Sequence, residues 1–343
     1  MFWPLFPRNF AYVDVNTKLT NITPMKNITR IITLRAGAVL PLLAISAFLT
    51  TSAMAQTGLI LFSGSGTLSS AKGAPTVSGL FTIEPSGAGL TQLCNDKSAT
   101  TPAWSPGQSY IAYGDTSTLP FKIYVMEAAG TLHGGTQFVA AQGGVAPSWS
   151  PSGAEIVYET LPGYQLEVVS VNPAAGTAGT PEPLIVDPAH EYFDPSWSPD
   201  GTRIAFERTT SSGASAIFIY TVETGAVVAL PVPYAGVMME PTWSPNSSQI
   251  AFLAENQKTG ETAVYLINAD GTGLEPFPRY PSNELAAGST AWSPDGTAIA
   301  MALDVPISKT TSQSSICEQD LATGVITVLT PSTLKADDPA WLP

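Results

Sequence analysis

Short apolar runs, separated by Gly, Pro, Asp and Asn, recur along the chain from residue 58 onward. Runs such as residues 204–206 and 217–220 are only three to five residues long. Turn sequences such as residues 222–225 (VETG) separate one run from the next. Brief apolar and β-branched runs bounded by turn residues are typical of β-hairpins and leave no room for long helices. The pattern therefore predicts an all-β protein.

A tryptophan-centred motif repeats through this region. Copies read PAWSPGQSYIAY, PSWSPSGAEIVY, PSWSPDGTRIAF, PTWSPNSSQIAF and TAWSPDGTAIAM, and a shortened copy, DPAWLP, ends the chain. Successive tryptophans lie 45 to 49 residues apart, at Trp104, Trp149, Trp197, Trp243, Trp292 and Trp341. This spacing matches one four-stranded propeller blade. We predict that the tryptophans pack between neighbouring blades, because each buries a large apolar area.

The two ends of the repeat region predict the number of blades. Residues 58–93 match the second, third and fourth strands of a unit, whereas residues 338–343 (DPAWLP) supply only a tryptophan strand. Together they make one blade, which adds to the five complete units between them. We therefore expect residues 56–343 to form a six-bladed propeller of four-stranded blades. Pairing of the C-terminal tryptophan strand with the N-terminal strands would close the ring and remove exposed sheet edges.

The repeated unit resembles the WD-like repeat of the TolB family propeller, over residues 58–343. In that family an additional α/β domain precedes the propeller and takes part in contacts with the Tol envelope machinery. The 55 residues ahead of this propeller show only a leader pattern. The resemblance implies a propeller of the cell envelope that binds other proteins, without the part played by the extra domain.

Residues 25–56 have the layout of a secretory signal peptide. Lys26, Arg30 and Arg35 precede an apolar stretch at residues 36–49, and small residues stand at Ala53 and Ala55. We predict cleavage after Ala55, translation from Met25, and a periplasmic or secreted location. A retained membrane anchor is the alternative, although the apolar stretch is shorter than the roughly 20 residues that span a bilayer.

The net charge of the chain limits the kinds of partner that it can bind. Without residues 1–55 the chain has 9 basic and 26 acidic residues, a formal charge of −17. Such a surface repels phosphate backbones and anionic lipids, which argues against nucleic acid and peripheral membrane binding. We expect a monomer that contacts the membrane only through an uncleaved N-terminal segment.

Two cysteines, Cys94 and Cys317, would enter a compartment where disulfides form. They lie far apart in sequence, so either a bridge or two buried thiols is compatible with the pattern.

The turn that follows each tryptophan is open to two interpretations. Ser198-Pro199-Asp200-Gly201 fits the preferences of a type I turn, while Asp200 could instead belong to a cation-binding loop. The equivalent residues in the other copies are Gly107, Ser152, Asn246 and Asp295, which a turn tolerates and a ligand site does not. The comparison favours a structural turn. A sialidase-type Asp box is disfavoured too, since there the tryptophan follows the turn.

Catalytic motifs are scarce. The chain has two histidines, His133 and His190, so the histidine-rich metal centres of lyases built on related blades cannot form. Nucleophile-elbow, phosphate-loop and zinc-peptidase motifs are absent from the sequence. We predict no catalytic residues, no bound metal and no cofactor.

The repeats differ most at the entry to the tryptophan strand, which we expect to lie in a loop at the mouth of the central channel. The residues three positions before each tryptophan are Thr101, Ala146, Asp194, Glu240, Ser289 and Asp338. We name seven channel-rim residues as candidate binding residues: Asp194, Glu240, Asp338, Asp337, Glu191, Tyr192 and His190. Carboxylates beside aromatic residues suit a cationic ligand, a metal ion or a basic peptide. A merely solvated acidic rim is the alternative.

We therefore expect a non-catalytic propeller that binds a protein or peptide partner of the cell envelope. The alternative is an enzyme for a carbohydrate or other small substrate, with Asp194, Glu240 or Asp338 as acid or base. It requires at least two of these carboxylates to lie close together with shifted pKa values.

Overall fold

The computed structural model describes residues 13–14, 58–209, 215–232, 237–255, 262–276, 286–308 and 311–343. The predicted leader and its cleavage site lie outside these residues. Among those described, no helix is long and apolar enough to cross a membrane.

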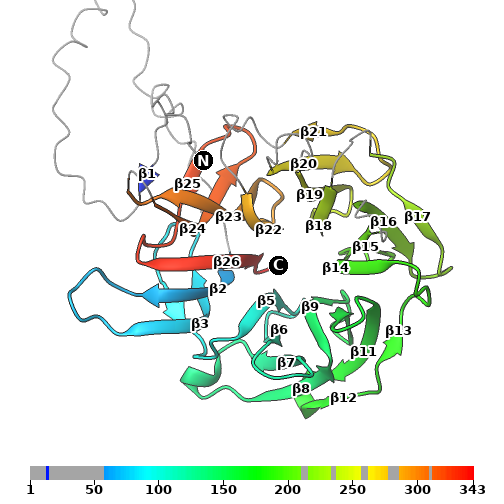
Figure 1. Ribbon diagram of the computed structural model, residues 1–343, viewed down its shortest axis with the longest axis horizontal. Helices are drawn as coiled ribbons and strands as arrows, with labels where there is room; N and C mark the ends of the chain where they lie inside the picture. Colours follow the sequence, from blue (N-terminus) through cyan, green and yellow to red (C-terminus); the bar gives the residue numbers. More distant parts are fainter. Residues whose placement is uncertain are drawn as a thin grey trace, which may run out of the picture.

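Six sheets surround a central channel, with the C-terminus near its middle (Figure 1). Blade 2 contains β5 (Ala99–Trp104), β6 (Tyr110–Asp115), β7 (Lys122–Glu127) and β8 (Gln137–Gln142). Blade 3 contains β9 (Gly144–Trp149), β10 (Glu155–Thr160), β11 (Leu166–Asn172), β12 (Thr177–Ala178) and β13 (Glu182–Pro183). Blade 4 contains β14 (Glu191–Trp197), β15 (Arg203–Thr209), β16 (Ser215–Thr221) and β17 (Val227–Ala229).

Blade 5 contains β18 (Val237–Trp243), β19 (Gln249–Glu255), β20 (Thr262–Asn268) and β21 (Glu275–Pro276). Blade 6 contains β22 (Ala286–Trp292), β23 (Ala298–Pro306), β24 (Ser312–Asp320) and β25 (Ile326–Val328), and β1 (Val13–Asp14) pairs in parallel with β25. The helical segments among the described residues are two single 3₁₀ turns, η1 (Thr131–His133) and η2 (Pro173–Ala175). The prediction of an all-β propeller with six blades is confirmed.

Blade 1 is assembled from both ends of the propeller. Its order is β26 (Leu334–Trp341), β2 (Ile60–Thr67), β3 (Thr76–Ile83) and β4 (Thr91–Gln92). β26 runs antiparallel to β2, with Trp341 opposite Ile60. The predicted closure of the ring is therefore confirmed.

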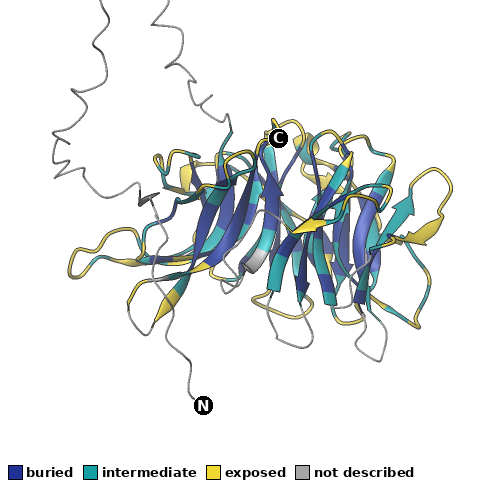
Figure 2. Ribbon diagram, turned by 90° about the horizontal axis from the view of Figure 1, so that it is seen from above, coloured by how far each residue is buried: buried dark blue, intermediate teal, exposed yellow. Residues whose placement is uncertain are grey.

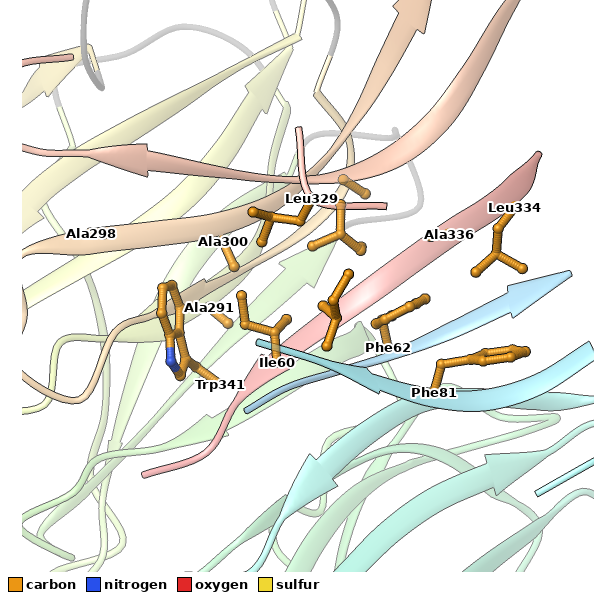
Figure 3. Packing of buried hydrophobic residues seen from close by; sticks show 13 residues of the cluster. Ile60, Phe62, Phe81, Ala291, Ala298, Ala300, Leu329, Leu334, Ala336 and Trp341 are labelled. Carbon is orange, nitrogen blue, oxygen red and sulfur yellow. The ribbon is translucent and has the colours of Figure 1, made fainter. Parts of the chain in front are cut away.

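A tryptophan lies in each of the six seams between blades. Figure 3 shows the closing seam, where Trp341, Leu334 and Ala336 of blade 1 pack near Ala298 and Ala300 of blade 6. The other five tryptophans lie in the clusters that join consecutive blades. The buried residues run along the strands, and the connecting loops are exposed (Figure 2). The tryptophans thus pack between neighbouring blades in this structure.

Indole hydrogen bonds tie three of the seams at the innermost strands. Trp149 Nε1 donates to the carbonyl of Ala103 at 3.2 Å, and Trp243 Nε1 donates to the carbonyl of Ser196 at 3.1 Å. Trp292 Nε1 donates in the same way to the preceding blade. These bonds fix neighbouring blades in register around the channel.

The two cysteines lie in different seams. Cys94 packs between blades 1 and 2, and Cys317 packs between blades 5 and 6. Both are buried thiols. The structure therefore supports two thiols rather than a bridge.

The turn after Trp197 is a structural turn, as its sequence indicates. The Gly201 N–H donates to the Ser198 carbonyl at 2.9 Å, and Gly201 has a φ of 75°. Asp200 Oδ1 accepts from Ser198 Oγ at 2.6 Å and from the Thr202 N–H at 2.9 Å, while Oδ2 pairs with Arg203 at 3.2 Å. The carboxylate oxygens are thus used within the turn. Partial burial opposes ionisation, but these hydrogen bonds hold the pKa of Asp200 below its usual range.

We expect Asp200→Ala to lower the free energy of unfolding by about 1 kcal/mol. The variant lacks the side-chain oxygen that accepts hydrogen bonds from Ser198 and Thr202 in the turn. Asp200→Asn should cost less, since Asn246 accepts the same bonds from Ser244 and Ser248 in the next blade. Urea denaturation of the two variants and the parent measures the difference. Equal losses in both variants would contradict the role given to the acceptor oxygen.

Candidate functional site

The residue three positions before each tryptophan has an unusual backbone conformation. Five of the six have a positive φ: Thr101 at 46°, Ala146 at 51°, Asp194 at 47°, Glu240 at 52° and Asp338 at 53°. Left-handed φ is uncommon for residues other than glycine. Because this conformation recurs at the same position of the repeat, it belongs to the structure of the blade and not to one particular residue.

Each of these residues precedes a proline and sits at an irregularity in the innermost strand pair. In blade 4 the pairing of β14 with β15 shifts register between Phe193 and Ser196, and β18 and β19 of blade 5 shift between Met239 and Thr242. Proline cannot donate to a neighbouring strand and is tolerated in sheets at bulges. A bulge changes the direction of a side chain, which here directs these residues toward the channel.

Three of the seven channel-rim residues line one cavity in the channel. Asp194, Glu240 and Asp338 border a space of about 570 Å³. Prolines and tryptophans of the innermost strands and their turns form much of the wall, and Pro343 lies at its opening. The cavity therefore faces the side of the disk where the C-terminus lies (Figure 2). The three carboxylates lie within β14, β18 and β26, and not in entry loops as the sequence led us to expect.

The other four channel-rim residues do not line this cavity. Tyr192 is 1% exposed, packs in the seam of blades 3 and 4, and donates to Asp187 at 3.2 Å. His190 Nδ1 lies 2.8 Å from the same carboxylate, and Glu191 is exposed at the start of β14. Asp337 is bonded to Ser314 and Lys335.

Asp338 is held by three donors. Its Oδ2 accepts from Ser63 Oγ at 3.0 Å, from Thr100 Oγ1 at 3.0 Å and from the Thr101 N–H at 3.1 Å. Thr101 Oγ1 in turn accepts from the Ala146 N–H at 3.0 Å. The channel residues of blades 1, 2 and 3 are thus linked in series, with the side chain of one bonded to the backbone of the next.

Asp194 and Glu240 have raised pKa values. Removal from bulk water and the negative charge of Asp338 raise the pKa of Asp194 to about 6. Removal from water, followed by the charges of Asp194, Asp338 and Glu207, raises the pKa of Glu240 to about 8. Near neutral pH Glu240 is therefore protonated to a greater extent than Asp194.

Two further carboxylates lie beside the cavity and were not among the predicted site residues. Glu159 on β10 and Glu207 on β15 are 6% and 8% exposed. Burial is the main cause that raises the pKa of Glu159 to about 8 and that of Glu207 to about 7, and the charge of Asp194 adds to both. A charged residue at the end of each apolar run, in IVYE and IAFE, was the available signal. Residues in such a run normally pack, so a carboxylate there indicates a special site.

Metal chelation has little support in the geometry. Within the described part of the chain, no group of three or more His, Cys, Asp or Glu residues is arranged to hold a metal ion. His133 and His190 lie away from the cavity lining. The carboxylates are close enough to repel one another but do not form a compact ligand set.

Comparisons with known proteins agree with the fold. The family model of the TolB beta propeller domain matches residues 189–343. No curated protein matches the chain in sequence.

Three solved structures illustrate the structural likeness. TolB from Acinetobacter baumannii has a TM-score of 0.65 at 18% identity, covering 84% of this chain and 67% of that one. A structure assigned to TolB from Agrobacterium tumefaciens has a TM-score of 0.53 at 14% identity, covering 83% and 98%. An oligogalacturonate lyase in complex with manganese has a TM-score of 0.51 at 16% identity, covering 80% and 74%.

At these identities the solved structures establish the fold, and they include an enzyme as well as TolB proteins. The same propeller serves unrelated functions, so the fold alone does not name the activity. The family match, the repeated Pro-x-Trp-Ser-Pro unit and the closed ring of six blades agree with one another. The described chain is a six-bladed β-propeller, and its residues 189–343 match the TolB beta propeller domain.

Proposed function

We propose that the protein is a secreted or periplasmic, non-catalytic scaffold that binds a protein or peptide partner of the cell envelope on the channel face. The observation that carries the proposal is the open cavity at that face, walled by prolines and tryptophans and lined by Asp194, Glu240 and Asp338. Ligand sites combine apolar walls with a few polar groups in this way. The leader pattern in residues 25–56 and the TolB likeness support the envelope location. The formal charge supports a partner other than nucleic acid.

Site-specific photocrosslinking tests this function. A photoreactive residue at Pro343, which is exposed at the opening of the cavity, should give a discrete crosslinked product in intact cells. The same residue at Val228, 61% exposed on the outermost strand of blade 4, is the matched control. Products of equal yield at both positions, or none at Pro343, would count against a partner on the channel face.

An enzyme acting on a carbohydrate or small ester is the second candidate. It is favoured by the raised pKa values of Asp194 and Glu240, which suit a general acid and base near neutral pH. We favour the scaffold over an esterase because neither histidine lines the cavity to activate a nucleophile, and over a glycosidase because the lining carboxylates stand on separate blades of the ring. Turnover of an oligosaccharide or ester panel that is lost in both Asp194→Asn and Glu240→Gln would reverse this preference.

A further inference from the structure

One acceptor in the channel cavity is left without a partner. Glu240 Oε2 is inaccessible to solvent, and it has no hydrogen-bond partner among the described residues. Glu240 lines the cavity, and the charges of Asp194 and Asp338 reach its carboxyl, which therefore lies on the channel side of β18. An unsatisfied buried carboxylate oxygen carries a desolvation cost, which the group lowers by taking up a proton. A bound donor would remove that cost.

The carboxylates of the cavity also lack a positive partner. No Lys or Arg lines it, and no ion pair within the described ranges involves Asp194, Glu240 or Asp338. Lys335 is the basic residue whose charge reaches Asp338, but its Nζ is 3.0 Å from Asp337 and its side chain is 60% exposed. The negative charge of the cavity is therefore not neutralised by the described part of the chain.

The order of the blades spreads this charge across the channel. Asp338 belongs to blade 1 and Asp194 to blade 4, which are opposite members of a ring of six, and Glu240 belongs to blade 5. The repulsion between Asp194 and Asp338 places both within electrostatic reach of one ligand. A single ion would approach only part of the set, because these carboxylates do not form a metal-binding group.

The walls favour an organic cation over a bare ion. The volume of about 570 Å³ lies within the range of about 300–1,000 Å³ typical of small-ligand pockets. Pro199, Pro245 and Pro294, in the turns that follow three of the tryptophans, line the cavity with rings that are at least partly exposed. A methylene stem can pack on such a surface while its charged end reaches the carboxylates.

We propose that the channel cavity binds the guanidinium group of an arginine side chain that the partner inserts from the channel face; this inference rests on the function proposed above. Guanidinium presents five N–H donors in a planar fork, which can reach carboxylates on separate blades at once. It is also more weakly hydrated than an ammonium group, so it enters a partly dry cavity at a lower cost. A quaternary amine has no N–H to donate to Glu240.

Titration of the full chain with N-acetyl-arginine amide tests the inference. Tryptophan fluorescence reports on the cavity, because Trp104, Trp197 and Trp243 line it. We expect the citrulline analogue, which has the same shape and no charge, to bind at least about tenfold more weakly, and the lysine analogue to fall between them. Glu240→Gln should weaken arginine binding at least about tenfold, whereas Glu155→Gln, an exposed residue of β10 outside the cavity, should leave it unchanged. Equal binding of arginine and citrulline, or calcium chloride that binds and displaces arginine, would overturn the proposal.

The pH dependence of the unmodified protein provides a second measurement that does not depend on how a variant folds. Protons compete with the cation at Asp194, Glu240, Glu159 and Glu207. Arginine binding should therefore weaken by at least about tenfold between pH 8 and pH 5 and release protons on binding. Binding that is constant over this range would also overturn the proposal. Loss of arginine binding with an intact crosslink at Pro343 would refute the arginine inference alone, and the converse would refute the partner alone.

Discussion

A chain that lacks residues 334–343 is expected to lose cooperative unfolding, because these residues supply the innermost strand of blade 1. Without β26 the edge of β2 is exposed, and the closing seam loses Leu334, Ala336 and Trp341. Removal of a buried tryptophan side chain alone costs about 3–5 kcal/mol. Loss of the whole strand should therefore remove a substantial part of the roughly 5–15 kcal/mol that stabilises a typical domain. Thermal unfolding followed by circular dichroism, with size-exclusion chromatography for aggregation through the open edge, measures the loss.

A circular permutant is the matched control for the role of closure. Joining Pro343 to Gly58 through an inserted Asp-Gly would reproduce the spacing of the repeated Trp-Ser-Pro-Asp-Gly turn, with new ends in the loop before Leu334. The two strands already pair as neighbours, with Trp341 opposite Ile60, so the link requires no change of sheet. We expect the permutant to unfold cooperatively near the parent temperature. A permutant as unstable as the truncated chain would show that chain order, and not strand pairing, holds the ring together.

Closure was predictable because it follows from counting strands. Each repeat carries its own turn and its own tryptophan. Residues 58–93 lack a tryptophan strand and residues 338–343 supply one, so the two segments can be assigned to the same blade. Local hairpin signals and the period of the repeat point to the same ring. The fold was therefore predicted down to the pairing of its two ends.

The channel was predicted less completely. Asp194, Glu240 and Asp338 were selected because the repeats differ at their position, and the structure brings all three to one cavity. Their position in an entry loop was wrong, because the proline that follows each of them introduces a bulge inside the innermost strand. The repeated x-Pro-x-Trp sequence could have predicted that bulge, since proline in a central strand is otherwise rare.

Neighbours in sequence were poor guides to the rest of the site. His190, Glu191 and Tyr192 adjoin Asp194 along the chain, but strand alternation and the direction of β14 take them to the seam and to the start of the strand. Glu207 lies on β15 of the same blade, opposite Phe193, whereas Glu159 on β10 belongs to the neighbouring blade and meets Asp194 across the seam. Contacts between blades depend on three-dimensional packing, which a repeat alignment of one chain does not contain.

The buried carboxylates should make the protein less stable as the pH rises from about 4.5 to about 8. Glu159, Glu207, Glu240 and Asp194 have folded-state pKa values of about 8, 7, 8 and 6, all above their ordinary values of 4.5 or 3.8. The folded state then binds protons more tightly than the unfolded state, so the stabilisation is fully present below the ordinary pKa and is lost as the pH rises through the folded-state pKa. Asp200, Asp270 and Asp295 have lowered pKa values and destabilise the fold only at more acidic pH. Melting temperatures measured from pH 3 to pH 9 should therefore peak at mildly acidic pH, near 5.

Glu159→Gln isolates one member of this set. The amide keeps an oxygen that can accept from the Asp194 N–H, but it carries no charge to bury beside Asp194 and Glu207. A shift from 4.5 to about 8 corresponds to at most about 5 kcal/mol, and relaxation of the site with entry of water around the charge reduces the expected gain to about 1–2 kcal/mol at pH 8.5. At pH 4.5 the parent side chain is already largely protonated, so the variant should unfold like the parent there. Glu155→Gln, four residues earlier on the same strand and exposed, should change neither value. A gain of equal size at both pH values would mean that packing, and not charge, limits stability at this position, and the carboxylates of the channel would then be ionised without cost in the folded protein.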